Sequence, residues 1–282
     1  MSSFRPKYAR YYDILYFDKN YETECNFIER ITRRTLHLPV RSILDISCGT
    51  GGHSIPLALR GYHVTALDSS RSMIEIAKAK ASRMGCEVEF RVEHMNCFKL
   101  PKQYDLCISM FDSIDYLRNE TEVVRAFETV SSHMAIGGLF MFQFWNKRAV
   151  KKLSVQQRHK VVNWKGLTIV RLADSELNVH DDNCTVNYRI IVIRGGIVID
   201  DFNEKHTMRY FDPKRIETLL KRSGFTITRF LKPFTEAKAS SDDWSVIALA
   251  RKGKERGQSV IAISPSQHGA NNGMHNSSLT RT

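Results

Sequence analysis

The chain has 282 residues, of which 42% are hydrophobic, so it can bury a full core as one large or two small domains. The net charge of +12 favours anionic partners, but the basic residues form no long run and no stripe interleaved with aromatic residues, so nucleic acid is not the expected partner. No apolar run reaches the length of a membrane span, and the six cysteines form no C-x-x-C pair and no zinc spacing. We therefore expect a reduced, cytoplasmic protein without a membrane segment, a signal peptide or a bound metal.

The segment before the first predicted strand is rich in tyrosine. Tyr12, Tyr16 and Tyr21 stand there among other aromatic residues, and apolar residues spaced along 21–38 predict a helix that packs on a sheet edge. The rings either pack this helix against the sheet or close over a bound ligand. The sequence leaves both interpretations open.

Residues 42–54 predict a strand, a turn of small residues and the start of a helix. The apolar run 43–46, which contains Asp45, is typical of a buried parallel strand. Ser47, Gly49 and Gly51 follow, and glycine permits a close approach of the backbone to a ligand. This order of elements forms the corner at which a doubly wound sheet holds a phosphate or a nucleoside.

A carboxylate follows the second predicted strand, 64–67. Asp68 stands 19 residues after Gly49, the offset at which a carboxylate can accept the hydroxyls of a ribose. The dinucleotide fingerprint G-x-G-x-x-G would need a glycine where Ser54 stands, so a nicotinamide cofactor is disfavoured.

The next elements continue the alternation of strands and helices. Ser69 and Ser70 can each cap a helix that carries Met73 on its apolar face, and the third predicted strand, 88–92, runs into His94 and Met95. The fourth, 104–110, is apolar and therefore central, and its carboxyl end faces the reaction site. The residues expected to reach the site from this end are Met110, Asp112, Ser113 and Tyr116, and the sequence equally allows Asp112 to cap a helix.

Further elements complete the core pattern. Asn119 caps a helix that should run to about Met134 and end at Gly137–Gly138, before a fifth strand. Asp212 caps a later helix. The last three strands of the core are expected at 139–144, 225–230 and 244–250.

Between the fifth strand and Asp212 the pattern changes to strands alone. We expect four strands between residues 161 and 210, with a break between 172 and 176, forming an antiparallel lid over the carboxyl end of the sheet. On the last strand, Glu204 and His206 share one face and Arg209 lies on the other. The first two suit either a histidine base steered by a carboxylate or a cross-strand pair on a half-exposed sheet.

The run Asp-x-Ser-Cys-Gly-Thr-Gly at 45–51 resembles the nucleotide-binding motif of class I S-adenosylmethionine-dependent methyltransferases, D/E-x-G-x-G-x-G, with Ser47 in place of the first glycine. The resemblance extends over roughly residues 8 to 252. It implies an α/β fold: a doubly wound, Rossmann-like seven-stranded sheet of five parallel strands and a terminal antiparallel hairpin, with an antiparallel β lid insert. The expected divisions are 1–146 for the lid helices and cofactor-binding core, 147–211 for the substrate lid, 212–252 for the rest of the core, and 253–282 for a disordered tail.

The resemblance implies S-adenosyl-L-methionine as the cofactor. In the family, a carboxylate in the first strand orients the methionine amino group, the glycine turn packs against the methionine part, and a carboxylate after the second strand holds the ribose. The family's adenine-binding aspartate is His94 here, and a neutral histidine can also accept a hydrogen bond from the adenine amino group. The expected cofactor-binding residues are Asp45, Ser47, Gly49, Gly51, Asp68, Met73, His94, Met95 and Met110.

The tyrosine-rich amino terminus, Trp145-Asn146 and the run 204–210 are similar to the small-molecule branch that methylates amino groups of nucleotide sugars and of glycine-like amines. This similarity implies in-line methyl transfer to a small amine or hydroxyl acceptor, with a nucleotide sugar as one candidate, by a monomer or homodimer. It implies catalytic roles for His206, Glu204 and Tyr116, and acceptor contacts for Tyr12, Tyr16, Tyr21 and Arg209.

The sequence leaves two other functions open. A methyltransferase-fold protein that binds without catalysis is favoured by the departures at Ser47 and His94, and the intact Asp45 and Asp68 argue against it. An RNA-modifying methyltransferase is favoured by the basic charge, and the lack of a basic or aromatic strand-binding segment argues against it.

Overall fold

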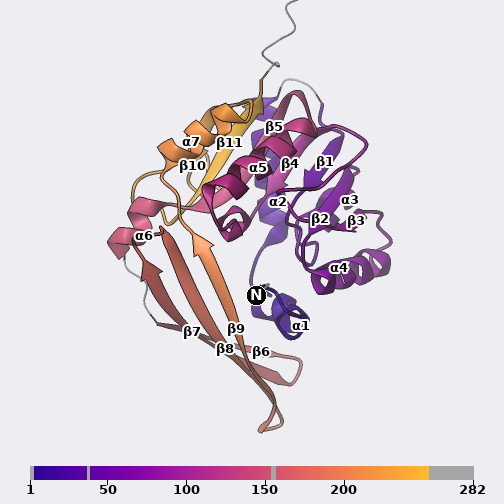
Figure 1. Ribbon diagram of the computed structural model, residues 1–282. Coiled ribbons are helices and arrows are strands. Elements are labelled where there is room, and N and C mark those ends of the chain that lie inside the picture. Colours follow the sequence, from indigo (N-terminus) through magenta and orange to yellow (C-terminus); the bar gives the residue numbers. More distant parts are fainter. Residues whose placement is uncertain (1–2, 37–38, 154–156, 254–282) are drawn as a thin grey trace, which may run out of the picture.

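The computed structural model describes residues 3–36, 39–153 and 157–253, and its core is a mixed sheet (Figure 1). Seven strands run in the order β10-β11-β5-β4-β1-β2-β3. β1 to β5 are parallel, and β11 pairs antiparallel with both β5 and β10, which confirms the predicted doubly wound sheet with a terminal hairpin. The strands are β1 (Ser42–Asp45), β2 (His63–Asp68), β3 (Glu89–Val92), β4 (Tyr104–Ser109), β5 (Met134–Trp145), β10 (Phe225–Leu231) and β11 (Ser245–Lys252).

Helices cover both faces of this sheet. One apolar cluster joins α5 and α7 to the sheet, and another joins α2, α3 and α4 to it. The expected caps are confirmed, because the side chains of Ser70, Asn119 and Asp212 each accept a backbone N–H of the first turn. The helices are α1 (Pro6–Leu15), α2 (Tyr21–Thr35), α3 (Ser54–Leu59), α4 (Arg71–Arg83), α5 (Glu120–Ser132), α6 (Lys147–Leu153), α7 (Pro213–Arg222) and the 3-10 helix η1 (Ser113–Tyr116).

The expected helix end at Gly137–Gly138 is wrong. α5 ends at Ser132, and both glycines lie inside β5, where its register with β4 shifts. Gly138 has no room for a side chain, because a Cβ would lie 2.9 Å from the carbonyl oxygen of Ala135. The two glycines therefore accommodate an irregularity in an inner strand of the sheet rather than stop a helix.

A second, antiparallel sheet extends from the core with the strand order β6-β7-β8-β9. The break expected after Leu172 is wrong, since β7 continues to Asn178 and pairs with β8 along this whole stretch. Tyr8 and Tyr11 of α1 pack in one cluster with Ile190 of β8, so the amino-terminal helix contacts the insert (Figure 1). The strands are β6 (Arg158–Trp164), β7 (Leu167–Asn178), β8 (Asn183–Arg194) and β9 (Ile197–Arg209).

Among the described residues, no helix combines the length and the apolar character needed to cross a bilayer. The predicted tail, 253–282, lies outside the described residues except for Gly253.

Candidate active site

A cavity of about 240 Å³ opens near the carboxyl ends of β1, β2 and β4, the edge at which an open α/β sheet binds its ligands. It is lined by the amino-terminal segment, the glycine turn, the segment after β4 and two strands of the insert. Of the residues expected from the sequence, the fold brings together Tyr12, Tyr16, Tyr21, Ser47, Gly49, Asp68, Met73, Met110, Asp112, Ser113, Tyr116 and His206.

The glycine turn keeps one wall of the cavity free of side chains. Gly49 and Gly51 have φ angles of +53° and +82°, which favour glycine. A Cβ on Gly49 would meet nothing within 4 Å, whereas one on Gly51 would lie 2.9 Å from Ile55 Cδ1. Gly49 thus leaves space in the cavity, and Gly51 allows α3 to pack closely behind the turn.

Asp68 is fixed at the cavity by two backbone groups. Its carboxylate accepts the N–H of Gly49 at 2.9 Å and the N–H of Ser70 at 2.8 Å. Burial raises the pKa of Asp68 to about 6, although both backbone donors oppose the rise. A carboxylate desolvated to this extent gains from further donors, so its position and chemistry fit the two hydroxyls of a ribose.

Asp45 supports the turn from behind and does not line the cavity. It is 2% exposed and accepts Ser54 Oγ at 2.7 Å and the N–H of Ser47 at 3.3 Å. Burial raises the pKa of Asp45. The carboxylate therefore ties the end of β1 to the start of α3.

Of the three residues expected to contact the adenine, one lines the cavity and two do not. Met73 is buried and lines the cavity. His94 is exposed and Met95 half-buried, and neither borders the cavity in the described part of the chain. His94 nevertheless lies close enough to Asp68 to lower the pKa of that carboxyl. Its adenine contact stays a prediction.

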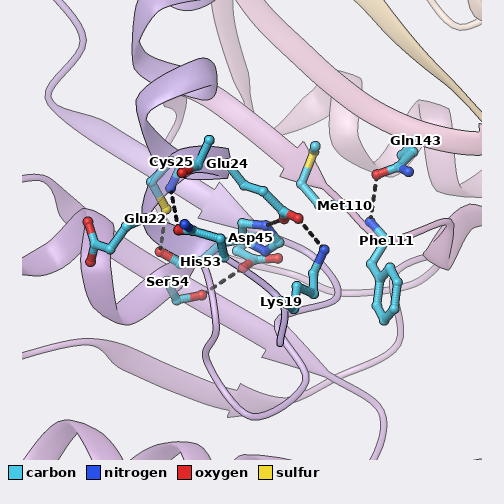
Figure 2. A network of polar contacts seen from close by, with 12 residues as sticks. Lys19, Glu22, Glu24, Cys25, Asp45, His53, Ser54, Met110, Phe111 and Gln143 are labelled. Atoms are coloured by element: carbon cyan, nitrogen blue, oxygen red, sulfur yellow. Dashed lines mark hydrogen bonds and ion pairs between the residues drawn. The ribbon is translucent and has the colours of Figure 1, made fainter. Parts of the chain in front are cut away.

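An ionic network borders the glycine turn, and Figure 2 shows its side chains converging beside Asp45. His53 Nε2 lies 2.6 Å from one carboxylate oxygen of Glu24, and Lys19 pairs with the other. Burial acts to raise the pKa of Glu24, but these two partners hold it below its usual range. Lys19 Nζ also lies 4.4 Å from the ring centre of Phe111, so the network ties the loop before α2 to the segment after β4.

The segment after β4 begins with an unusual backbone. Phe111 and Asp112 have φ angles of 60° and 58°, which residues other than glycine rarely adopt. The N–H of Phe111 donates to Gln143 Oε1 at 3.1 Å (Figure 2), and Ser245 Oγ donates to Asp112 Oδ1 at 2.5 Å. Contacts from β5 and β11 thus hold Asp112 at the cavity wall, where burial raises its pKa to about 6.

His206 of β9 and Tyr116 of η1 meet at the cavity. The Tyr116 hydroxyl lies 2.6 Å from His206 Nδ1, and Nε2 is buried without a hydrogen-bond partner among the described residues. Burial, with Arg171 and Arg5 nearby, lowers the pKa of His206 to about 4. The imidazole is therefore neutral at neutral pH.

Glu204 is held by Arg5 rather than by His206. The backbone N–H of Arg5 donates to Oε1 at 3.2 Å, and its Nε donates to Oε2 at 2.9 Å. His206 Nε2 lies 3.7 Å from Glu204 Oε1, beyond hydrogen-bond distance. Glu204 therefore anchors the amino-terminal segment to the insert and makes no hydrogen bond to His206, and steering of His206 by this carboxylate stays a prediction.

Tyrosines form a large part of the remaining wall. Arg171 Nη1 donates to the Tyr16 hydroxyl at 3.0 Å, and the guanidinium lies 5.2 Å from the ring centre of Tyr188. Burial raises the pKa of Tyr188 to about 12, and raises the pKa values of Tyr8 and Tyr12 well above their usual range. These hydroxyls stay protonated, so the wall is aromatic and neutral.

The fold does not bring Arg209 to the cavity. Its Nη1 donates to the carbonyl of Arg118 at 3.2 Å, and its guanidinium lies 5.7 Å from the ring centre of Phe211. Because successive side chains of a strand point to opposite faces of the sheet, Arg209 lies on the face of β9 opposite to His206. No group of side chains suited to a metal ion occurs within the described ranges.

Several lining residues were missed by sequence reasoning. Tyr188 could not have been found from the turn at Gly195-Gly196, because the register shifts between Val192 and Ile193, before the pair of Tyr188 with Glu204. The aromatic and small residues of the other segments also show no sequence pattern that would place them at the cavity. The missed residues are Phe4, Tyr8, Cys48, Thr50, Gly52, His53, Phe111, Trp145, Tyr188 and Met208.

Comparison with known sequences shows that the chain is similar to methyltransferases. Residues 43–138 match the model of a methyltransferase domain family. The chain is 26% identical over 254 residues to "Putative methyltransferase YqeM" of Bacillus subtilis (strain 168), covering 88% of this chain and 96% of the relative. It is 25% identical over 227 residues to the dTDP-3-amino-3,4,6-trideoxy-alpha-D-glucopyranose N,N-dimethyltransferase of Streptomyces venezuelae, covering 78% and 90%.

Solved structures share the fold. An S-adenosylmethionine-dependent methyltransferase from Clostridium acetobutylicum ATCC 824 superposes with a TM-score of 0.76 at 20% identity, covering 88% of this chain and 98% of that one. The sugar N-methyltransferase KedS8 from Streptoalloteichus sp ATCC 53650 superposes with a TM-score of 0.72 at 21% identity, covering 86% and 93%. Each superposition covers almost the whole length of the solved structure.

Proposed function

Because this chain belongs to the class I S-adenosylmethionine-dependent methyltransferases, we propose that it methylates a nitrogen atom of a small-molecule amine. Among such amines we favour amino sugars linked to a nucleotide. Relatives named as N,N-dimethyltransferases of dTDP-linked amino sugars align with 78% and 79% of this chain, across both the core and the insert.

The cavity suits S-adenosyl-L-methionine as the methyl donor. The desolvated carboxylate of Asp68 faces it beside Gly49, where the wall carries no side chain, and Ser47, Met73 and Met110 line the same space. When bound, this cofactor supplies a methyl group on a positively charged sulfur and leaves as a neutral thioether. The protein therefore has no departing anion to stabilise, and its contribution is to bind, to align and to exclude water.

The observation that carries the proposal for an amine is the state of His206. The ring is neutral and lines the cavity, and its Nε2 has no partner among the described residues. In the tautomer that carries its proton on Nδ1, the ring donates to Tyr116 and leaves the Nε2 lone pair without a partner among the described residues. Such a lone pair accepts an N–H of the acceptor and orients the nitrogen, and Tyr116 fixes the ring.

The tyrosines and the insert form the rest of the acceptor site in this proposal. The faces of Tyr12, Tyr16 and Tyr188 favour a cationic group and exclude water. Residues 147–211 act as the acceptor-binding domain. The six cysteines are all unpaired, in keeping with a reducing, cytoplasmic location.

The test is transfer of a tritiated methyl group from S-adenosylmethionine to matched acceptors. We expect label in a dTDP-linked amino sugar and none in the same sugar with a hydroxyl in place of the amine. Calorimetry with S-adenosylhomocysteine serves as a control for a competent cofactor site. Label in the hydroxyl sugar, or transfer only to a non-amine in a metabolite extract, contradicts the proposal.

A further inference from the structure

We propose that Asp112 is a catalytic residue that contacts the acceptor amine and takes up its proton. The inference rests on the proposed function, because it assumes that the acceptor nitrogen enters the cavity as an ammonium ion. The sequence allowed Asp112 to be a helix cap, but its side chain makes no capping hydrogen bond to η1.

The geometry aims Asp112 at the reaction site. It is 9% exposed, follows the central strand β4, and lines the same cavity as Tyr116 and His206. Two consecutive positive φ angles, at Phe111 and Asp112, turn the chain sharply at this point. Strained backbone of this kind persists where the surroundings impose it, and it clusters at functional sites.

Ser245 and the side chain of Trp145 hydrogen-bond the Asp112 carboxylate without saturating it, and the Lys19 charge nearby also acts to lower its pKa. The Ser245 hydroxyl donates to Asp112 Oδ1 at 2.5 Å from the neighbouring strand β11. An ionised carboxylate has about four lone-pair positions, so Asp112 keeps acceptor capacity for a ligand in the cavity. Its burial makes a cation a favourable partner, since a buried charge is costly unless it is paired.

The other ionisable groups near the cavity are already engaged or are poor proton acceptors. His206, with its pKa lowered to about 4, gives up a proton readily. Asp68 is bound by backbone N–H groups, and Glu24 is paired with Lys19 and His53.

A second buried carboxyl, Asp115, lies on the same 3-10 helix. It is 0% exposed, does not line the cavity, and accepts the backbone N–H of Trp145 at 3.0 Å. Burial raises the pKa of Asp115 well above its usual range, which favours its neutral form. Asp112 is thus the carboxylate at the cavity that can still accept a proton from a ligand, and Asp115 provides a matched control.

The chemical step balances with these groups alone. The entering ammonium pairs with ionised Asp112, and one N–H proton passes to a carboxylate oxygen, which converts a buried ion pair into two neutral groups. The freed lone pair forms the new N–C bond while the methyl carbon leaves sulfur, and the bonding electron pair stays on sulfur. The product, a protonated and methylated amine, leaves the site. Asp112 then releases the proton that it took up to solvent, which restores the ionised carboxylate.

Sinefungin tests this contact without a known acceptor. It is a cofactor analogue that carries an ammonium group where the cofactor carries its methyl group, whereas S-adenosylhomocysteine carries nothing there. By calorimetry at pH 8, we expect the wild-type protein to prefer sinefungin over S-adenosylhomocysteine by roughly tenfold, the effect of a hydrogen bond to a charged group. Asp112→Asn should remove this preference and leave S-adenosylhomocysteine affinity unchanged.

The matched variants distinguish contact from structural support. Asp115→Asn should keep the preference for sinefungin, and Ser245→Ala, which retains the carboxylate, should reduce it only in part. Equal weakening of both ligands in Asp112→Asn, or an unchanged preference, overturns the proposal. Loss of the preference in Asp112→Asn together with no labelling of amino sugars would refute the favoured acceptor and still support Asp112 at the reacting centre.

Discussion

The two halves of the cavity are built in different ways. The cofactor half comes mainly from one continuous stretch, residues 45–68, in which β1, the glycine turn, α3 and β2 follow one another, with Met73 and Met110 added from later segments. The acceptor half joins distant segments: Tyr116 and His206 are 90 residues apart, and Arg5 and Glu204 are 199 apart. A local motif therefore fixes the first half, and only tertiary packing creates the second.

The two halves also differ in the groups that hold them. Asp68 is fixed by backbone N–H groups, which every residue other than proline supplies. In the acceptor half, side chains hold side chains, as in the contacts of His206 with Tyr116 and of Arg171 with Tyr16. Sequence changes can thus remodel the acceptor half while the cofactor half keeps its geometry, and this difference can be tested.

The largest effect is expected for Asp68→Ala. The variant loses the acceptor for two ribose hydroxyls, so affinity for S-adenosylhomocysteine should fall by about 100-fold or more, as expected for hydrogen bonds to a charged group. Isothermal titration calorimetry measures it, with Asp201→Ala on the insert surface as the control. Wild-type affinity in Asp68→Ala would refute the ribose role.

Removal of His206 should affect only the acceptor half. His206→Ala should lower turnover by about 100-fold, a usual contribution of a side chain in contact with the reacting nitrogen, and should spare cofactor affinity. The readouts are tritium transfer to the amino sugar and calorimetry with S-adenosylhomocysteine, and His180→Ala on an exposed turn is the control. Unchanged turnover would remove His206 from the site.

The buried imidazole should also make stability depend on pH. Its folded pKa of about 4 lies below its usual 6.5, so the unfolded chain binds more protons between these values. The stability contributed by this group is present above pH 6.5 and is lost as the pH falls towards 4.

This dependence can be isolated with His206→Gln. Between pH 6.5 and pH 5, the wild-type protein should lose about 2 kcal/mol of unfolding free energy relative to the variant. Urea denaturation at both pH values measures the difference, and the subtraction cancels the opposite contributions of Asp68 and Asp112, whose pKa values are raised. Parallel pH profiles of the two proteins would show that His206 is not buried in its neutral form.

The smallest effect is expected for Arg209→Ala. The side chain binds the carbonyl of Arg118 outside the cavity, so the Michaelis constant for the acceptor should not change. Steady-state kinetics check this, with Arg171→Ala as the contrasting variant, because Arg171 contacts Tyr16 and Tyr188 of the cavity wall. A raised Michaelis constant in Arg209→Ala would restore its predicted role in acceptor binding.

The sequence by itself determined the parts of this protein that depend on short-range rules. Strand and helix order follow from periodicity, three helix starts follow from capping side chains, and the place of Asp68 follows from a turn that only small residues can make. Tertiary structure decided the rest. Glu204 pairs with Arg5 rather than with His206, and Ser245 holds Asp112 at the cavity wall, because segments far apart in the chain meet there and no local pattern encodes which side chains will face each other.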